Sequence, residues 1–580
     1  MSKKIIIFGG LVVIMAIGIF FRVWQIDKIP PGIYPDEAMN GVNALETRDT
    51  NQWQVYYPDN NGREGLMILL LAIAYKFLPA TAWSLRLISI IVGSLTVLGL
   101  YFLAKELFKS KSYSPNRWFS PGQCLALTSA FLLAVSFWHV NFSRIAFRAI
   151  FVPFLTVWCF YFLWRYFRHG QIISLIVSGI FFSLGFYTYI AFRMAPLLIL
   201  IAWLPYLWRW YKDKKQNKLP TTPLKTWHIV IYVLVIIAVV SPIAIYFAQH
   251  PEQFMGRASD VAAWKTASPV KNTLISFGKT LGMFNIYGDC NWRHNLPCQP
   301  QLLWPESIGF LVGLIIVIRN IILGIRQRCQ KLKLDMAAGP LDAPTNNQTL
   351  WPGWHVSIFI LCWLGLMMLP AALTNEGLPH ALRAIGTIPP AYLLTALGLV
   401  WLYSLTQNKL SKALTNPQTQ ERISIKNQIK RIKIFLTILF ILSLIAIGAY
   451  QYQKYFITWA QNPNTAGAFT QKYVQMAEFL NFYSQRQIPE YVIVNEGGVL
   501  IKSTPVSAET IKYLTYGKSN PTYLLPEQLD QIKTNQDKKV NALIILMQDN
   551  KNLLNQIIAK YPKAITGNVT TFGEFRFISI

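Results

Sequence analysis

Long apolar runs separated by short polar segments dominate the chain. A helix needs roughly 20 mostly apolar residues to cross the hydrocarbon core of a membrane. Eleven runs meet or approach that length, and they lie at 5–23, 85–103, 121–138, 149–165, 171–190, 195–208, 228–249, 306–325, 354–373, 384–405 and 434–451. The pattern therefore predicts a polytopic α-helical membrane protein with about 11 spans.

One further apolar run, residues 66–78, is only 13 residues long. Its length suits a half-span or an interfacial helix. Counting it as a span would exchange the inner and outer sides for every loop that follows it. If it does not span and the N-terminus is inside, the inner segments carry 26 Lys and Arg and the outer loops carry 13. Basic residues concentrate in cytoplasmic loops, so this arrangement is favoured, with residues 66–78 at the outer surface.

The N-terminal run resembles a secretory signal, but its apolar stretch is longer and no small-residue cleavage site follows it. We interpret it as an uncleaved first span. The expected location is the plasma (inner) membrane of a bacterium, with a cytoplasmic N-terminus.

Beyond residue 452 the pattern changes to that of a soluble α/β domain. Alternating segments such as YVIVN, NALIILM and FGEFRFISI predict strands, and NKNLLNQIIAKY predicts a helix between the last two. The predicted division is a transmembrane catalytic domain at 1–452 and an extracytoplasmic α/β domain at 453–580.

The formal charge of +28 could indicate nucleic-acid binding, but the basic residues gather between apolar runs, as expected of cytoplasmic loops. No nucleic-acid partner is expected. Six cysteines in 580 residues are too few for a disulfide scaffold. Cys290 and Cys298 fall in one outer loop, where a disulfide and two free thiols are both open.

Two adjacent carboxylates, Asp36 and Glu37, follow the first span in the stretch PPGIYPDEAMNG. One interpretation is structural, because an acidic residue after Pro35 favours the start of a helix. The other is catalytic, and the two are compatible.

Other polar side chains fall on the same predicted side of the membrane. An arginine at the end of a span commonly anchors to lipid headgroups or caps a helix, so each has a structural alternative. Arg144 and Arg148 are four residues apart, and two such cations repel unless an anion lies between them. The outer-face candidates are Glu64, Arg144, Arg148, Asp289, Arg293, His380 and Arg383.

Carboxylates and arginines together at a membrane surface suit glycosyl transfer from a lipid phosphate. A carboxylate can take the proton of the acceptor hydroxyl as that hydroxyl attacks the sugar. Arginines can bind the phosphate leaving group bidentately and stabilise its charge.

The order of motifs resembles the GT-C glycosyltransferases related to protein O-mannosyltransferases and lipid A aminoarabinose transferases (glycosyltransferase family 39-like). The motifs span about residues 1–405, and they are PDEAMNG, GREGLM, AWSLRLISIIVGSLTVLGLYFLAKELF, SRIAFRAIFVP, YGDCNWRHNLPCQP and LPHALRAIGTIPP. The resemblance implies an inverting transferase with a GT-C fold and a polyprenyl-phosphate sugar as donor. The acceptor, whether protein, lipid or cell-wall glycan, is not specified.

Residue by residue, the resemblance implies that Asp36 is the catalytic base and that Glu37 is its acidic neighbour. Glu64 falls where the aminoarabinose transferases place a metal-binding glutamate, so a divalent metal is a candidate cofactor. Arg144 is similar to the arginine expected near the donor phosphate. Arg148 departs from the mannosyltransferases, in which an acidic residue is more usual at that position. We expect Arg148, Arg383 and His380 to be further phosphate ligands. Asp289 and Arg293 complete the outer-loop candidates.

Two other classes remain. An O-antigen ligase-like transferase would use a lipid diphosphate and need no acidic pair in the first loop. A lipid transporter or flippase would be expected to show repeated halves and charges at mid-membrane, and neither feature is found in the sequence.

Overall fold

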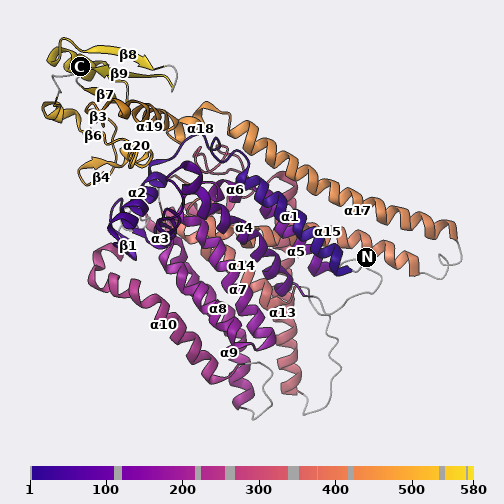
Figure 1. Cartoon of the computed structure of the whole chain (residues 1–580). Helices are drawn as coiled ribbons and strands as arrows, with labels where there is room; N and C mark the ends of the chain where they lie inside the picture. Colours follow the sequence, from indigo (N-terminus) through magenta and orange to yellow (C-terminus); the bar gives the residue numbers. More distant parts are fainter. Residues whose placement is uncertain are drawn as a thin grey trace.

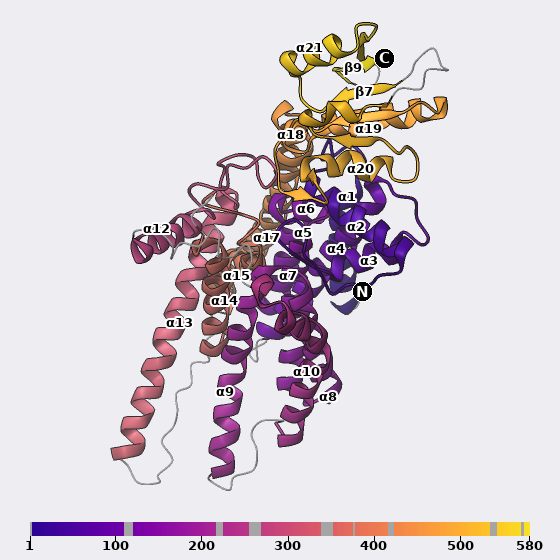
Figure 2. The same cartoon turned by 90° about the vertical axis from the view of Figure 1, so that its left-hand side faces the viewer.

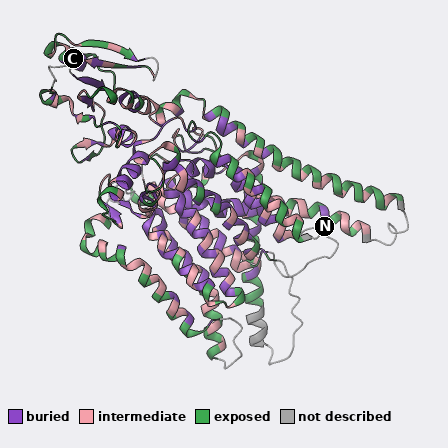
Figure 3. Ribbon diagram, in the orientation of Figure 1, coloured by how far each residue is buried: buried purple, intermediate pink, exposed green. Residues whose placement is uncertain are grey.

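A bundle of long helices carries a smaller α/β unit at one end (Figure 1). This computed structural model describes residues 3–109, 120–215, 224–254, 268–337, 352–374, 377–415, 423–533, 542–569 and 573–580. Buried residues concentrate in the centre of the bundle, while the outer helices are largely exposed (Figure 3).

Within the described residues, nine helical segments are long and apolar enough to cross a membrane. They are Lys4–Val23, Ala82–Leu107, Arg148–His169, Ile190–Lys215, Thr226–Gln249, Trp304–Gln330, Trp354–Ala372, Ile385–Leu414 and Ser424–Trp459. A bent pair, α5 (Pro121–Val135) and α6 (Phe137–Ser143), makes a tenth. The remaining predicted run, at 171–190, contains α8 (Ile172–Leu184), which is apolar but has only 13 residues. The polytopic helical fold expected from the sequence is confirmed.

The remaining long elements of the bundle are named as in Figures 1 and 2. They are α1 (Lys3–Val23), α4 (Ala82–Leu107), α7 (Phe151–His169), α9 (Ala195–Lys215), α10 (Thr226–Gln249), α12 (Pro269–Gly282), α13 (Trp304–Ala337), α14 (Trp354–Ala372), α15 (Ile388–Thr415) and α17 (Ile423–Tyr452).

The predicted span 121–138 is not a straight helix, because the chain turns by 60° between α5 and α6. Ser136 stands at the break with non-helical backbone angles, and its Oγ accepts a hydrogen bond from the His139 amide at 3.3 Å. The hydroxyl thus satisfies an amide at the start of the new helix. The bend directs the following loop, with Arg144 and Arg148, toward the end of the bundle.

Glycines allow α13 and α15 to lie in direct backbone contact at the centre. A Cβ on Gly313 would come 2.0 Å from the carbonyl oxygen of Leu394, and one on Gly398 would come 1.9 Å from that of Gly309. Small residues commonly permit such close helix packing in membranes. This contact fixes the two spans that flank the Asp289 and His380 loops.

Between α1 and α4 the chain forms a group of short elements at the end of the bundle. They are α2 (Pro35–Thr50), the antiparallel strands β1 (Tyr56–Tyr57) and β2 (Arg63–Glu64), and α3 (Leu66–Ala74). The apolar run at 66–78 therefore forms a helix of nine residues, too short to span.

The C-terminal unit contains a five-stranded sheet with the strand order β6-β3-β7-β9-β8. The first three strands run parallel, and the last two pairings are antiparallel. Its elements are α18 (Pro463–Ala468), α19 (Gln471–Tyr483), β3 (Glu490–Ile493), β4 (Leu500–Ile501), β5 (Thr504–Pro505), α20 (Glu509–Thr515), β6 (Thr522–Leu524), β7 (Leu543–Leu546), α21 (Lys551–Lys560), β8 (Ile565–Val569) and β9 (Phe575–Ser579).

Alternate residues of the central strands face opposite layers. Val492 packs in a core with α19 and α20, whereas its neighbour Ile493 packs in a second core with α21. This period-two pattern gives a three-layer α/β arrangement and agrees with the strands predicted from sequence.

The last span, α17, continues as a helix beyond residue 452 before the chain enters the α/β unit. A π-helical segment, Gln453–Trp459, follows α17 directly, and its Tyr455, Phe456 and Trp459 belong to the core of the bundle. The division of the chain into two domains at residue 452 stays a prediction.

Candidate active site

Asp36 lies in the first turn of α2, at the end of the bundle that carries the α/β unit. Pro35 occupies the first helical position, and the preceding Tyr34 is the N-cap residue with extended backbone. Proline is pre-organised for that position, and a carboxylate in the first turn is favoured by the helix dipole. Asp36 is half-buried, and its Oδ1 accepts a hydrogen bond from Asn60 Nδ2 at 2.7 Å.

Glu37 is fully buried and both of its carboxylate oxygens are engaged. Oε1 lies 3.2 Å from Arg86 Nη2, and Oε2 accepts a hydrogen bond from the Ala146 amide at 2.6 Å. Successive helical residues point about 100° apart, so Asp36 and Glu37 face different surroundings. The sequence analysis grouped the two as catalytic residues. The structure gives Glu37 a bracing contact between α2, α4 and the loop before α7.

Arg86 is a site residue that the sequence analysis did not single out. Its guanidinium donates to the carbonyl oxygens of Ile26 at 2.8 Å and Pro30 at 3.3 Å, and also to that of Gly32. The side chain is fully buried. It therefore fixes the loop that leads into α2. A signal was present, since a charged residue within an apolar span is rare and commonly functional.

Arg63 on β2 is a second residue that was missed. It donates to Asn40 Oδ1 at 3.0 Å and to Asn43 Oδ1, both on α2. Burial lowers the pKa of Arg63 to about 10, and the positive charge of Arg148 acts in the same direction, while Asp36 opposes it. Arg63 thus adds a positive charge beside Asp36.

Glu64 pairs with two arginines. Its Oε2 lies 2.6 Å from Arg148 Nη1, and its Oε1 lies 4.0 Å from Arg193 Nη2. Within the described chain, no cluster of three His, Cys, Asp or Glu side chains with metal-ligand spacing includes Glu64. With cations already facing both oxygens, the residues around Glu64 do not fit a metal ion.

Arg144 is fully buried and points into the protein. It donates to the carbonyl oxygens of Phe21 at 2.9 Å, Trp24 at 2.7 Å and Ile29 at 2.8 Å. The sequence analysis placed Arg144 and Arg148 on one phosphate. In the structure Arg144 holds the end of α1, while Arg148 pairs with Glu64, so the two do not converge.

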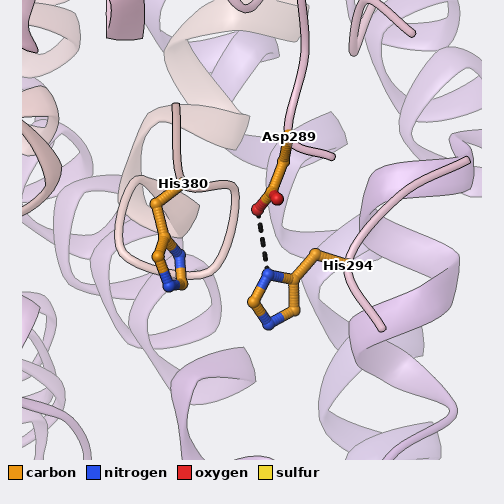
Figure 4. A group of neighbouring side chains, drawn as sticks. All are labelled: Asp289, His294 and His380. Carbon is orange, nitrogen blue, oxygen red and sulfur yellow. Dashed lines mark hydrogen bonds and ion pairs between the residues drawn. The ribbon is translucent and has the colours of Figure 1, made fainter. Parts of the chain in front are cut away.

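Asp289, His294 and His380 come together from two loops far apart in sequence (Figure 4). Asp289 Oδ2 lies 2.9 Å from His294 Nδ1 and accepts a hydrogen bond from the Ala381 amide at 2.7 Å. The His294 and His380 rings lie 4.9 Å apart, centre to centre. Burial lowers the pKa of His294, while Asp289 opposes that effect. The carboxylate of Asp289 joins the two loops.

Two arginines flank this cluster. The guanidinium of Arg293 lies 4.0 Å from the centre of the Tyr34 ring. Arg383 donates to Thr374 Oγ1 at 2.6 Å. Since Tyr34 is two residues before Asp36, Arg293 links the Asp289 cluster to the start of α2.

The alternative left open for Cys290 and Cys298 is resolved in the structure, where they form a disulfide. The bridge closes a loop that contains Arg293 and His294, and Asp289 directly precedes it. The disulfide therefore restricts the backbone of this loop at both of its ends.

Comparisons with known proteins agree with this architecture. Residues 68–255 match the family model described as dolichyl-phosphate-mannose-protein mannosyltransferase. The chain is similar to the solved structure of ArnT from Cupriavidus metallidurans bound to undecaprenyl phosphate, with 12% identity, coverage of 98% of both chains and a TM-score of 0.50. For ArnT in the apo state the identity is 11%, the coverage 98% of this chain and 97% of that chain, and the TM-score 0.51.

A weaker similarity is to the arabinofuranosyltransferase AftD from Mycobacteria, with 11% identity, coverage of 100% of this chain and 40% of that chain, and a TM-score of 0.44. No curated protein matches the sequence. The ArnT-like architecture is that of the GT-C membrane enzymes, which confirms the fold expected from the sequence motifs. Together with the mannosyltransferase family match, it indicates that the chain is a multi-pass membrane glycosyltransferase.

Proposed function

We propose that this chain transfers a sugar from a polyprenyl-phosphate donor to an acceptor at the outer face of the membrane, with inversion and with Asp36 as general base. The observation that carries the proposal is the setting of Asp36. It is a half-buried carboxylate at a helix start, with one oxygen fixed by Asn60 and with Arg63 nearby.

The reaction is a single displacement. The acceptor hydroxyl gives its proton to the Asp36 carboxylate while its oxygen bonds to the anomeric carbon. The bond between that carbon and the phosphate oxygen breaks, and the electron pair stays with the polyprenyl phosphate. Attack from the face opposite the leaving group inverts the configuration.

The phosphate ligands are reassigned from the sequence proposal. Arg144 is committed to three backbone carbonyls, so it is unsuited to a ligand. Arg293 and Arg383 lie close enough to the Asp289 cluster for their charges to act on His294, and Arg293 also contacts the ring of Tyr34, just before α2. We assign the donor phosphate to these two arginines, with Arg148 as a further cation, and leave His380, which the sequence analysis counted as a phosphate ligand, to the Asp289 cluster. The ArnT structure that contains undecaprenyl phosphate supports a polyprenyl carrier for this fold.

Transfer from synthetic polyprenyl-phosphate sugars by the purified full-length chain in nanodiscs tests the proposal. The anomeric configuration of the product, measured by NMR, tests inversion. Asp36→Asn should reduce turnover by roughly 10²–10⁴-fold, the usual contribution of a general base. Asp27→Asn is the matched control, because Asp27 is an exposed aspartate in the segment between α1 and α2. Near-normal turnover by well-folded Asp36→Asn protein would exclude Asp36 as the base.

The proposed orientation places the N-terminus in the cytoplasm and the α/β unit outside. It rests on the distribution of Lys and Arg between loops. Cysteines introduced at Asp27 and Lys563 should react with an impermeant reagent added outside, and cysteines at Lys214 and Lys430 should not. Labelling of positions 27 and 214 from the same side contradicts this orientation.

A further inference from the structure

The Asp289, His294 and His380 cluster has the composition of a metal site, and it is separate from Glu64. One ligand atom from each residue lies within 4.8 Å of the others. Ligands of a tetrahedral zinc ion lie about 2.0–2.2 Å from the metal, and thus roughly 3.3 Å from one another. The pair of Asp289 Oδ2 and His294 Nδ1, at 2.9 Å, is close to that separation.

We propose that these three side chains bind one zinc-type divalent cation, with Asp289 as the oxygen ligand and His294 and His380 as the nitrogen ligands. Two imidazoles and one carboxylate, with a fourth position left for water or another ligand, is a common zinc arrangement. Figure 4 shows the two rings and the carboxylate approaching a shared space from two loops.

The ligands are supported as metal ligands usually are. Asp289 Oδ2 accepts a hydrogen bond from the Ala381 amide, and Oδ1 accepts one from the Asn291 amide at 2.8 Å. Such contacts fix the orientation of a coordinating carboxylate. The Cys290–Cys298 disulfide closes the loop that directly follows Asp289. Asp289 and His294 are almost fully buried, while His380 is half-buried, which leaves a side from which an ion can enter.

Binding requires small rearrangements. The cation replaces the proton between Asp289 Oδ2 and His294 Nδ1, and that proton moves to Nε2 as the imidazole changes tautomer. If His380 binds through Nδ1, the ion also replaces a long hydrogen bond of 3.3 Å from the Arg383 amide. The His380 ring then moves by about 1.5 Å at most toward the other two ligands, to reach the zinc ligand spacing.

The surrounding charges select the kind of ion. The positive charges of Arg293 and Arg383 lie close enough to act electrostatically on His294, and they would repel any cation bound there. A single carboxylate cannot offset two arginines for a hard ion such as Mg²⁺ or Ca²⁺, which need several oxygen ligands. Imidazole nitrogens favour zinc, so the cluster should bind zinc and not magnesium or calcium.

Zinc content of the full-length protein tests the inference. The purified chain is loaded with ZnCl₂, desalted and analysed by inductively coupled plasma mass spectrometry. The wild type should retain about one zinc per chain. Loss of a hydrogen-bond partner of a metal ligand typically lowers metal affinity by roughly 10–100-fold. His294→Ala and His380→Ala remove a ligand itself, so each should lower zinc affinity by more than that. Glu64→Gln and His250→Ala, which lie outside the cluster, should retain the metal.

Absence of retained zinc in the wild type overturns the proposal, as does normal zinc content in both histidine variants or loss of zinc in Glu64→Gln. If the histidine variants do not fold, the wild type alone decides. Co²⁺ should then give visible d–d absorption, and zinc should raise the unfolding temperature because it binds only the folded state. If Co²⁺ gives no d–d absorption and zinc does not change the unfolding temperature, the proposal is overturned. Because every readout is metal binding, failure here leaves the proposed transferase reaction untested and intact.

Discussion

Glu37 and Arg86 form an ion pair in which neither side chain is exposed to solvent. The pair joins α2, which carries Asp36, to the first long span after it. Arg86 also donates to carbonyl groups on both sides of the tight loop at residues 26–32. The charge of Glu37 therefore supports the backbone that positions its neighbour, and the two adjacent carboxylates perform different tasks.

Removing one partner of this pair should destabilise the protein. Glu37→Gln leaves the Arg86 charge buried without its counter-ion, which typically costs about 3–5 kcal/mol. Unfolding in mixed detergent and SDS micelles measures the effect. Asp36→Asn is the matched control, and it should leave stability nearly unchanged because Asp36 is only half-buried. A Glu37→Gln protein of normal stability that has lost all turnover would instead favour a direct catalytic role.

Sequence reasoning selected Asp36, Glu64, Asp289, Arg293, His380 and Arg383 as candidates because they are polar residues between apolar runs. The same reasoning found the spans, because a spanning helix is recognised from the apolar composition of about 20 consecutive residues. It could not divide roles between Asp36 and Glu37, because that division depends on Arg86, which lies 49 residues away. The buried position of Arg144 was missed for a similar reason, since the Phe21, Trp24 and Ile29 carbonyls that it binds have no side-chain signature.

The stability of the α/β unit should depend on pH through Glu490 at the start of β3. Burial raises the pKa of Glu490 to about 7, with a hydrogen bond from Ser519 acting in the opposite direction. The folded unit then holds this proton more tightly than the unfolded chain, whose pKa is 4.5. Unfolding releases the proton, so stability should fall as the pH rises from about 4.5 to about 7 and change little above that.

Hydrogen exchange of the β3 and β7 amides in the full-length protein, corrected for intrinsic rates, follows this change. Glu490→Gln cannot ionise, and its protection should lack the Glu490 step. Glu527→Gln is the control, because Glu527 lies outside the buried cores. A pH profile shared by wild type and Glu490→Gln would exclude Glu490 as its source.

Substitution of Arg293 or Arg383 should change the donor KM, whereas substitution of the buried Arg144 should not. Arg293→Ala and Arg383→Ala should raise the KM for the lipid-linked donor. Loss of a charged hydrogen bond costs about 1.5–3 kcal/mol, or roughly ten- to a hundred-fold in affinity. Arg144→Ala should instead lower the yield of folded protein, because three carbonyl groups lose their donor.

KM for donor and acceptor, measured separately on monodisperse variants, distinguishes these effects. The folded fraction of Arg144→Ala should keep the wild-type donor KM. Lysine at position 293 or 383 should restore donor binding only in part, because it lacks the planar fork of arginine. An unchanged donor KM in both Arg293→Ala and Arg383→Ala would remove them as phosphate ligands.

The α/β unit should contribute to turnover by holding the segment before Asp36. The Ile33 carbonyl oxygen accepts hydrogen bonds from the hydroxyls of Thr470 and Thr510, each at 2.8 Å. Gly32 lies against the same segment, where a Cβ would come 2.1 Å from the Phe469 carbonyl oxygen. Contacts between residues more than 430 positions apart thus fix the backbone three residues before the proposed base.

Thr470→Val and Thr510→Val remove one hydroxyl each with little change in shape. Because the two donors share one acceptor, either variant alone leaves the Ile33 carbonyl with a partner and should have a small effect. The double variant leaves it unsatisfied, which costs about 1–3 kcal/mol if the loop stays in place. If the loop moves to reach water, Asp36 shifts and kcat falls while the donor KM stays nearly constant. Steady-state kinetics of both single variants and the double variant measure this, with Thr566→Val on exposed β8 as the control. Purely additive losses, or a double variant with normal kcat and normal stability, would show that the α/β unit does not position α2 through Ile33.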